Sequence, residues 1–381
     1  KMGKEFNPQT KLGILGGGQL GRMFIQEAIG LNVCVHVLDP ADNAPCAAIA
    51  NVFVQGDFAD YETVLNFGKE VDVITIEIEH VNIEALEELE RIGKLVYPRP
   101  SALRTIKDKG LQKLFYAAHQ IPTAPFVLVE NKMEAALHVS EGPFMQKLRT
   151  GGYDGKGVTP FRNEADLEHA FDAPSVLEEM VHFEKELAVI VARNAFGELR
   201  VFPLVEMEFN SEANLVEFIF SPANVSVEVA HEAAEIAKNI VEQLDHVGLL
   251  AVELFLTETG QLLVNEVAPR PHNSGHHTIE ACYTSQYAQH MRAILNLPLG
   301  DTALRSAGVM INLLGEKGFT GTAKYEGLEE VLSTQGAYVH LYGKEETKPF
   351  RKMGHITICL PELEQAKQLA RKFLSSVKVK A

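Results

Sequence analysis

The sequence predicts an α/β protein of two or three domains that opens with a doubly wound parallel sheet. At 381 residues, the chain is longer than a single hydrophobic core usually grows. Over residues 11–39 the order is strand, glycine turn, helix and strand, which is typical of the first unit of a doubly wound sheet. Later in the chain, pairs of short apolar runs flank tight turns and indicate hairpins, so the whole is α/β with an α+β portion.

Composition limits the partners of this chain. The 46% hydrophobic and 23% charged residues are typical of a globular protein in water. With 35 Lys and Arg against 51 Asp and Glu, the net charge is −16, which disfavours binding to nucleic acid or to an anionic membrane. The sequence contains neither a membrane-spanning apolar run nor a signal-peptide pattern. The four cysteines form no CxxC pair, so we expect reduced thiols and a cytoplasmic location.

The first strand, Lys11–Leu15, runs into Gly16-Gly17-Gly18-Gln19-Leu20-Gly21, and a helix then follows over residues 22–28. A second strand, 33–38, ends at Asp39. The turn matches GxGxxG, and Asp39 lies near the position of a ribose-binding acid. One hypothesis is therefore an NAD-dependent dehydrogenase. The motif does not specify NAD, however, because a helix N-terminus can bind any phosphate group.

A third strand, 71–76, places Glu77, Glu79 and His80 at its carboxyl end, where ligands of open α/β sheets bind. The alternative is that these acids merely begin a polar loop. Asn82 then caps a helix over residues 83–92, whose apolar side chains fall on one face.

The most distinctive stretch is the glycine-rich segment 149–157. Four glycines in seven residues leave backbone N–H groups free to surround a phosphate, although an exposed hairpin turn has a similar composition. Lys147 emerges from a strand directly before the loop, Lys156 lies inside it, and Val158–Phe161 returns as the second strand. A lysine at this position suits a triphosphate.

Two downstream stretches complete a nucleotide site. Glu178-Glu179-Met180-Val181, with Glu186 opening a strand over 187–191, offers the carboxylate and apolar walls that an adenosine needs. Strands 251–256 and 262–265 flank a Glu-Thr-Gly turn, and reflection about this turn places Glu253 opposite Glu266. Two carboxylates on neighbouring strands, beside Asn265, predict a magnesium site.

The segment that follows, from Arg270 to His277, is rich in side chains that bind polar substrates. Zinc on His272, His276 and His277 is an alternative that lacks a supporting acid. Near the C-terminus, Ala307–Leu314 and 337–342 read as strands, and 363–373 reads as a helix. Arg351 and Lys352 precede a further strand, and by themselves they would be a solvated basic turn.

Taken together, GGGQLGRM, GGYDGKG, VNEVAPRPHNSGH and RKMGH resemble, in this order, the 5-(carboxyamino)imidazole ribonucleotide synthetases of the ATP-grasp superfamily. The resemblance implies a Rossmann-like pre-ATP-grasp domain over residues 1–107 and an ATP-grasp domain over 108–305. The latter divides into a lid (about 108–182) and a base (about 183–305), and a small C-terminal domain covers 306–381.

The resemblance also implies the ligands and their residues. ATP would bind Lys109, Lys147, Gly152, Tyr153, Asp154, Gly155, Lys156, Gly157, Glu178, Glu179, Met180, Val181, Glu186, Asn265 and Glu266. Magnesium, as two ions, would bind Glu253 and Glu266, which count with Lys147 and Arg270 as catalytic residues. The aminoimidazole ribonucleotide would contact Gly18, Gln19, Leu20, Glu77, Tyr153, Arg270, Asn273, Ser274, His276, Arg351 and Lys352.

The implied reaction is the ATP- and bicarbonate-dependent carboxylation of 5-aminoimidazole ribonucleotide through carboxyphosphate, in purine biosynthesis, by a homodimer. Candidate bases for the amine are His276 and Glu77. This chain departs from the family pattern at Lys109, where we expect arginine, and at Phe209, where relatives often carry a histidine. Rival readings are another ATP-grasp ligase or transformylase, the dehydrogenase, and a catalytically silent nucleotide-binding subunit.

Overall fold

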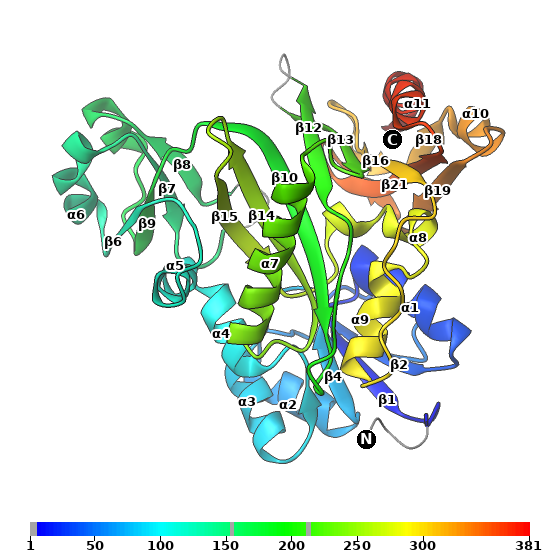
Figure 1. Cartoon of the computed structure of the whole chain (residues 1–381). Coiled ribbons are helices and arrows are strands. Elements are labelled where there is room, and N and C mark those ends of the chain that lie inside the picture. Colours follow the sequence, from blue (N-terminus) through cyan, green and yellow to red (C-terminus); the bar gives the residue numbers. More distant parts are fainter. Residues whose placement is uncertain (1–5, 153–155, 211–214) are drawn as a thin grey trace.

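The N-terminal part of the chain is built around a parallel sheet of five strands in the order β3-β2-β1-β4-β5. The computed structural model describes residues 6–152, 156–210 and 215–381 of the chain (Figure 1). The strands of this sheet are β1 (Lys11–Leu15), β2 (Cys34–Asp39), β3 (Val52–Gln55), β4 (Val73–Ile76) and β5 (Leu95–Val96). The order in which the strands are added reverses between β1 and β4: β2 and β3 lie on one side of β1, and β4 and β5 lie on the other. A ligand-binding crevice is therefore expected at the carboxyl ends of β1 and β4.

Helices cover both faces of this sheet, as in other doubly wound folds. They are α1 (Gln19–Gly30), α2 (Tyr61–Lys69) and α3 (Ile83–Arg91), followed by α4 (Pro100–Lys107). The predicted cap is confirmed, because the Asn82 side chain accepts a hydrogen bond from the Ala85 amide at 2.9 Å. Both apolar layers are well buried, with Leu12 and Leu15 of β1 showing 0% exposure.

A smaller antiparallel sheet of four strands, in the order β6-β9-β7-β8, follows in the chain. Its strands are β6 (Phe126–Val129), β7 (Phe144–Leu148), β8 (Val158–Phe161) and β9 (Ser175–Glu179). The helices of this region are α5 (Lys109–Ala118) and α6 (Lys132–Leu137), with short 3₁₀ turns at Val139–Glu141 and Glu164–His169. Figure 1 shows this unit at one end of the molecule, beside the hairpin of β14 (Gly248–Thr257) and β15 (Leu262–Ala268).

The largest sheet is antiparallel and has nine strands, in the order β15-β14-β10-β12-β13-β16-β21-β19, with β11 beside β10. These strands are β10 (Phe183–Arg193), β11 (Leu199–Val201), β12 (Val205–Asn210), β13 (Leu215–Ser221), β14 (Gly248–Thr257), β15 (Leu262–Ala268), β16 (Ala307–Leu314), β19 (Ala337–Leu341) and β21 (Lys352–Leu360). The β14–β15 hairpin is confirmed in its predicted register, since Glu253 lies directly opposite Glu266.

Helix α7 (Val227–Gln243) packs across β10 and β14, and its Ala237, Ile240 and Val241 are completely buried (Figure 1). Two further helices, α8 (Thr278–Ala281) and α9 (Gln286–Ile294), also contact this sheet. Helix α9 packs against α1 as well, so the same helix joins the large sheet to the N-terminal domain. Helix α7 ends at Gln243, with Leu244 as its C-cap.

The C-terminal segment extends the large sheet instead of forming a separate one, because β16 pairs with β13. Its remaining elements are β17 (Gly321–Thr322), β18 (Lys324–Glu326), α10 (Leu328–Leu332), β20 (Glu346–Thr347), α11 (Leu363–Ser376) and β22 (Lys378–Lys380). Helix α11 covers β16 and β21, with Phe373 at 0% exposure. Within the described ranges, every helix is too short or too polar to cross a bilayer.

Truncation of Phe373 tests the packing of α11. Phe373→Ala should lower the stability of the C-terminal region by about 3–5 kcal/mol, because a fully buried aromatic ring leaves a cavity. Leu332→Ala, at a position that is 70% exposed, is the matched control and should change stability by less than about 0.5 kcal/mol. Differential scanning calorimetry measures both, and equal losses in the two variants would contradict this packing.

Candidate functional site

The glycine turn after β1 is occupied by carboxylates from its own domain. The Gly18 and Gly21 amides donate to the two oxygens of Glu77 at 2.8 and 3.0 Å, and the Gly17 amide donates to Asp39 at 2.8 Å. Burial raises the pKa of Glu77, although the two amide hydrogen bonds oppose this effect. These amides are the ones that would hold a pyrophosphate, so the arrangement disfavours the dinucleotide reading.

Glu77 nevertheless lies where the sequence placed it, at the carboxyl end of β4 and beside the switch point between β1 and β4. It lines a small pocket together with Leu20 of α1 and Pro271. The structure therefore brings the glycine turn, including the half-buried Gln19, close to the segment that begins at Arg270.

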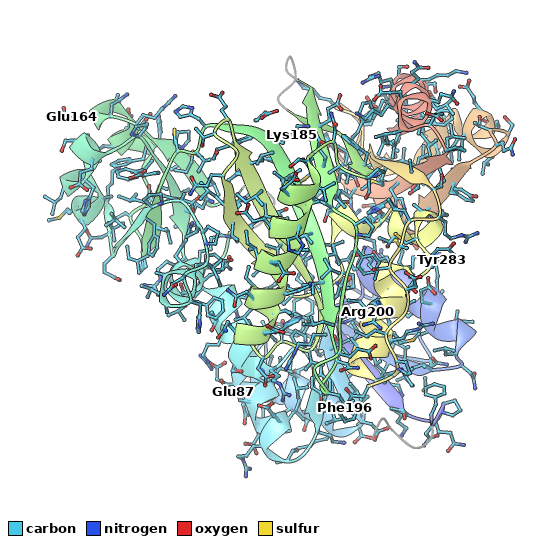
Figure 2. All side chains as sticks on the ribbon, viewed as in Figure 1. Glu87, Glu164, Lys185, Phe196, Arg200 and Tyr283 are labelled. Carbon is cyan, nitrogen blue, oxygen red and sulfur yellow. The ribbon has the colours of Figure 1, made fainter. Side chains whose placement is uncertain are left out.

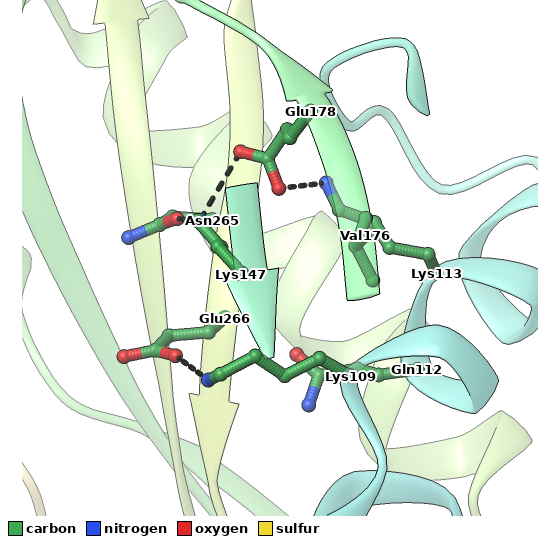
Figure 3. Close-up of a pocket in the computed structure, with 8 residues that line it drawn as sticks. All are labelled: Lys109, Gln112, Lys113, Lys147, Val176, Glu178, Asn265 and Glu266. Atoms are coloured by element: carbon green, nitrogen blue, oxygen red, sulfur yellow. Dashed lines mark hydrogen bonds and ion pairs between the residues drawn. The ribbon is translucent and has the colours of Figure 1, made fainter. Parts of the chain in front are cut away.

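A second pocket lies between α5, the four-stranded sheet and β15 (Figure 3). Its positive charges come from three lysines, two of which lie one turn apart on α5 and the third at the end of β7. The residues that line it are Lys109, Gln112, Lys113, Lys147, Val176, Glu178, Asn265 and Glu266. Five of these, Lys109, Lys147, Glu178, Asn265 and Glu266, are sequence-predicted nucleotide contacts from segments far apart in the chain.

Two ion pairs organise this pocket. Lys109 Nζ lies 2.6 Å from Glu266 Oε2, and Lys113 Nζ lies 2.9 Å from Glu178 Oε2. Lys147 links the second pair to β15, since its Nζ lies 3.3 Å from Glu178 Oε1 and donates to Asn265 Oδ1 at 2.9 Å. Three ammonium groups converging on one recess provide a site for a multiply charged anion.

The sequence analysis missed three lining residues, Gln112, Lys113 and Val176, and Lys113 is the charged one among them. Its side chain is 4% exposed, and burial lowers its pKa, against the opposing charge of Glu178. Its ammonium donates to the hydroxyl of Thr123 at 2.5 Å, and Thr123 in turn donates to the Val264 carbonyl. The available signal was spacing, because residues four apart share one helix face.

Three acidic residues lie on one face of the large sheet. Glu253 of β14 is opposite both Glu266 of β15 and Ala188 of β10, and Glu186 lies two residues from Ala188 on the same face. Glu186 does not open its strand as predicted, because β10 already begins at Phe183. The polar run Phe183–Lys185 gave no strand signal, yet it pairs with the far end of β14.

The Glu253–Glu266 pair has the electrostatics of a cation site. Burial, followed by the charge of Glu266, raises the pKa of Glu253. Burial would also raise the pKa of Glu266, but the Lys109 ammonium outweighs it and holds that pKa below its usual range. The two carboxyl groups share a hydrogen bond, so the pair retains a proton when no metal is near.

This pair fits magnesium that is bound together with phosphates. In the described part of the chain, no three His, Cys, Asp or Glu side chains are placed to hold a metal by themselves. Magnesium is commonly held by one or two carboxylates, with substrate phosphates and waters as its other ligands. The zinc alternative at His272, His276 and His277 is not supported by this arrangement.

The glycine-rich loop is anchored at its root. Arg149 forms a two-pronged ion pair with Asp108, both contacts at 2.9 Å, and its carbonyl accepts a hydrogen bond from the Lys109 amide at 2.8 Å. Gly151 and Gly157 have φ values of +80° and +78°, which other residues rarely adopt. The predicted ligands Tyr153, Asp154 and Gly155 lie outside the described residues, and flanking Gly152 and Lys156 lie within them.

Glu178 and the exposed Glu179 end β9, directly before Met180 and Val181. The Glu179 amide donates to the Pro125 carbonyl, and the Met180 amide donates to the Pro143 carbonyl. Lys185, labelled in Figure 2, lies near the start of β10 and forms an ion pair with Glu206 at 3.2 Å. The side chain of Phe209, on neighbouring β12, lies outside the described side chains.

Arg270 and the adjacent histidine face the acidic residues. Arg270 forms an ion pair with Glu79 at 2.9 Å, so a residue of the N-terminal domain holds this guanidinium. His272 lies 3.5 Å from Glu253 and 2.8 Å from the hydroxyl of Ser274. Burial, followed by the charge of Arg270, lowers the pKa of His272 to about 3, so it is neutral. Asn273 lies beside it in the 3₁₀ turn Asn273–Gly275.

His276 is more deeply buried than a substrate ligand needs to be, with 1% exposure. Its Nδ1 lies 3.2 Å from the Gln286 amide and 3.1 Å from the Tyr287 hydroxyl, and its ring stacks on His355 at 4.7 Å. Burial lowers its pKa well below the usual range. The structure gives this ring a packing environment, and its role towards a substrate stays a prediction.

Arg351 and Lys352 face different surroundings. The Arg351 guanidinium donates to the Glu346 carbonyl, and burial raises the pKa of Tyr325 on β18 against the opposing charge of Arg351. The charge of Lys352, by contrast, helps to lower the pKa values of His272 and His276, whose main cause is burial. The structure therefore brings Lys352 close to the histidine segment, and the role of Arg351 towards a substrate stays a prediction.

Comparison with known proteins now decides the family. Three family models match consecutive parts of the chain: a ribonucleotide synthetase preATP-grasp domain at 9–107, an ATP-grasp domain at 114–287, and a phosphoribosylaminoimidazole carboxylase C-terminal domain at 308–369. The N5-carboxyaminoimidazole ribonucleotide synthase of Bacillus subtilis is 38% identical over 97% of this chain and 96% of that protein. The chain belongs to the N5-carboxyaminoimidazole ribonucleotide synthetase family.

Solved structures agree with this assignment. The N5-carboxyaminoimidazole ribonucleotide synthetase of Thermotoga maritima is 43% identical, with a TM-score of 0.91 over 98% of this chain and 100% of that one. A synthase from Aspergillus clavatus, in complex with ADP and 5-aminoimidazole ribonucleotide, is 35% identical with a TM-score of 0.88, over 97% of this chain and 98% of that one.

Some relatives of this family are longer. The chloroplastic phosphoribosylaminoimidazole carboxylase of Vigna aconitifolia is 41% identical over 92% of this chain. The chain spans 64% of the length of that protein and 64–65% of two fungal carboxylases. Family membership confirms the ATP-grasp fold with its N-terminal Rossmann-like sheet, and it overturns the dehydrogenase reading.

The ionisation of Glu186 can be tested in the nucleotide-free protein. Burial raises its pKa to about 7, against the opposing charge of Lys147. The folded state thus holds a proton that the unfolded state releases near its ordinary pKa of 4.5, so this group destabilises the fold increasingly between pH 4.5 and 7. Glu186→Gln should melt higher than the parent protein at pH 8.

Melting temperatures from pH 5 to 9 measure this effect. The advantage of Glu186→Gln should shrink as the pH falls below 7 and stay constant above it. Glu258→Gln, in the exposed turn between β14 and β15, is the control and should show no such trend. An advantage that does not depend on pH would contradict the raised pKa.

Proposed function

We propose that this chain carboxylates 5-aminoimidazole ribonucleotide with ATP and bicarbonate, and releases 5-(carboxyamino)imidazole ribonucleotide, ADP and phosphate. The family relationship supports this proposal, as do relatives named for the product and one solved with ADP and 5-aminoimidazole ribonucleotide. The observation that carries it in this chain is the convergence of Lys109, Lys113 and Lys147 on a pocket walled by Asn265 and Glu266.

ATP would occupy this pocket between the four-stranded sheet and the large sheet. Lys109 and Lys147 would contact its phosphates, with the loop from Gly152 to Gly157 above them. Glu178–Val181 would face the adenine. Glu186, which is negatively charged above pH 7, would accept hydrogen bonds from the ribose hydroxyls. The division into domains at residues 107 and 305 stays part of this proposal.

Magnesium, as one or two ions, would be held by Glu253 and Glu266, with Asn265 beside them. When bound, it neutralises the charge that develops on the transferred phosphoryl group. The proton shared by the two carboxylates supports this assignment, because a divalent cation replaces such a proton readily.

The second substrate would bind between the glycine turn of the N-terminal domain and the segment that begins at Arg270. Glu77, Arg270, Asn273 and Ser274 would surround it, and Lys352 would meet its phosphate. Glu79 holds Arg270 at the edge of this region, where its guanidinium can bind bicarbonate and then carboxyphosphate.

Each step can be written from these residues. A bicarbonate oxygen attacks the γ-phosphorus of ATP, so that a P–O bond forms, the bond to ADP breaks and carboxyphosphate results. Lys147 and Lys156 stabilise the charge on the transferred group. The amine nitrogen then attacks the carbon of carboxyphosphate, or of carbon dioxide formed from it, and phosphate leaves. The amine proton passes to phosphate or to Glu77.

We further propose that the protein forms a homodimer and acts in the cytoplasm.

ADP release tests the function directly. With ATP, magnesium and bicarbonate, release should rise sharply on adding 5-aminoimidazole ribonucleotide. Glycinamide ribonucleotide with formate should give no such rise, which separates this activity from that of a transformylase. If no acceptor stimulates the release, the proposed reaction is wrong. If ADP release is absent throughout, the catalytically silent alternative is favoured.

Glu266→Gln should abolish ATP turnover, because it removes the carboxylate shared by Lys109 and the proposed metal. The fold should persist, since Glu266 is half-buried at the surface of the sheet. Steady-state ADP release and circular dichroism measure the two effects. A folded Glu266→Gln protein with retained turnover would remove Glu266 as a metal ligand.

Lys352 and Arg351 form a matched pair for the ribonucleotide site. Lys352→Ala should raise the KM for the ribonucleotide by about tenfold or more while the KM for ATP changes little, because a phosphate contact is lost. Arg351→Ala should have a smaller effect, since its guanidinium faces Glu346 and Tyr325. If Arg351→Ala raised the KM for the ribonucleotide more than Lys352→Ala did, Arg351 and not Lys352 would be the phosphate ligand.

A further inference from the structure

Lys109 and the proposed metal require the same carboxylate. The ammonium group lies 2.6 Å from Glu266 Oε2, and Figure 3 shows the side chain extending from α5 across the pocket to β15. The carboxylate pair therefore already holds one cation in the absence of nucleotide.

A divalent ion on Glu266 would lie within a few ångströms of this ammonium group. At that distance two positive charges repel each other strongly in a recess that water enters only partly. Metal and ammonium thus compete for one site.

The two lysines of α5 differ in how firmly they are held. Lys113 is 4% exposed and is held between Glu178 and the Thr123 hydroxyl. The side chain of Lys109 is 24% exposed, and its partner Glu266 is 41% exposed. Water reaches the Lys109–Glu266 pair more than the Lys113–Glu178 pair, so Lys109 is the α5 lysine that can more easily exchange its carboxylate for another anion.

We propose that Lys109 is a resident counter-ion, which keeps divalent metal off Glu266 until the phosphates of a nucleotide draw the ammonium group away. This inference rests on the proposed function, because it assumes that nucleotide phosphates enter this pocket. Its consequence is an order of binding: metal does not occupy the empty protein and enters together with the nucleotide. Lys109 is then a positioning residue as well as a phosphate ligand.

Manganese binding to the nucleotide-free protein tests this inference without any turnover. Free Mn²⁺ can be counted by electron paramagnetic resonance in the parent protein and in Lys109→Met, which keeps the side-chain volume and removes the charge. Lys109→Met should bind Mn²⁺ at least about tenfold more tightly than the parent. Lys109→Arg retains the charge and should behave like the parent protein.

Two controls assign the gain to this site. Lys238→Met removes a lysine that is paired with Glu235 on the exposed face of α7, and it should not change Mn²⁺ affinity. The double variant Lys109→Met/Glu266→Gln should lose the gain. An unchanged Mn²⁺ affinity in folded Lys109→Met, or a gain that survives Glu266→Gln, would overturn the proposal.

The parent protein gives an independent test if Lys109→Met fails to fold. Its melting temperature should respond to Mn²⁺ with ADP and stay constant with Mn²⁺ alone, and tight binding of Mn²⁺ alone would refute the counter-ion role. This result is separable from the proposed reaction. If Lys109→Met gains Mn²⁺ affinity but 5-aminoimidazole ribonucleotide does not stimulate ADP release by the parent protein, the counter-ion role stands and the proposed acceptor is wrong. If the ribonucleotide stimulates the parent protein but Lys109→Met gains no Mn²⁺ affinity, the proposed reaction stands and the counter-ion role is wrong.

Discussion

The acidic face of the large sheet is the constraint on which the site depends. Glu186, Glu253 and Glu266 lie on three adjacent strands, in a recess where unpaired negative charge is costly. Lysines from outside this sheet offset the charge: Lys109 from α5 and Lys147 from β7. The contact between the small and large sheets is thus electrostatic at its centre, and its counter-ions are the groups that would bind phosphates.

A buried carboxylate plays a related part in the N-terminal domain. Glu77 accepts hydrogen bonds from the amides of Gly18, the N-cap of α1, and of Gly21 in its first turn, so the residue that follows β4 caps the helix that follows β1. The glycine turn has the sequence of a dinucleotide-binding motif, but its anion is supplied by the protein itself. Glu79, two residues after Glu77, forms an ion pair with Arg270, which follows β15 of the large sheet. This ion pair joins the N-terminal domain to the large sheet.

Local patterns predicted much of this structure, because the features concerned depend on neighbours in the sequence. The register of Glu253 against Glu266 follows from the turn between their strands, and the cap at Asn82 follows from its own helix. The exceptions depend on residues far along the chain. Neither the burial of His276 against His355 nor the opposite surroundings of Arg351 and Lys352 can be read from spacing, because partner strands decide them. Lys113 was missed because its partner Glu178 lies on a distant strand.

The pairing of β13 with β16 makes the C-terminal segment part of the same hydrogen-bonded ladder as the acidic strands. Without that segment, β13 would present a row of unsatisfied backbone amides and carbonyls to solvent, and such an edge invites pairing with another chain. Phe218 and Phe220 of β13, now at 0% and 1% exposure, would be uncovered beside it. The segment that carries Lys352 therefore also protects the edge of β13 against pairing with another chain, and selection on either role constrains the other.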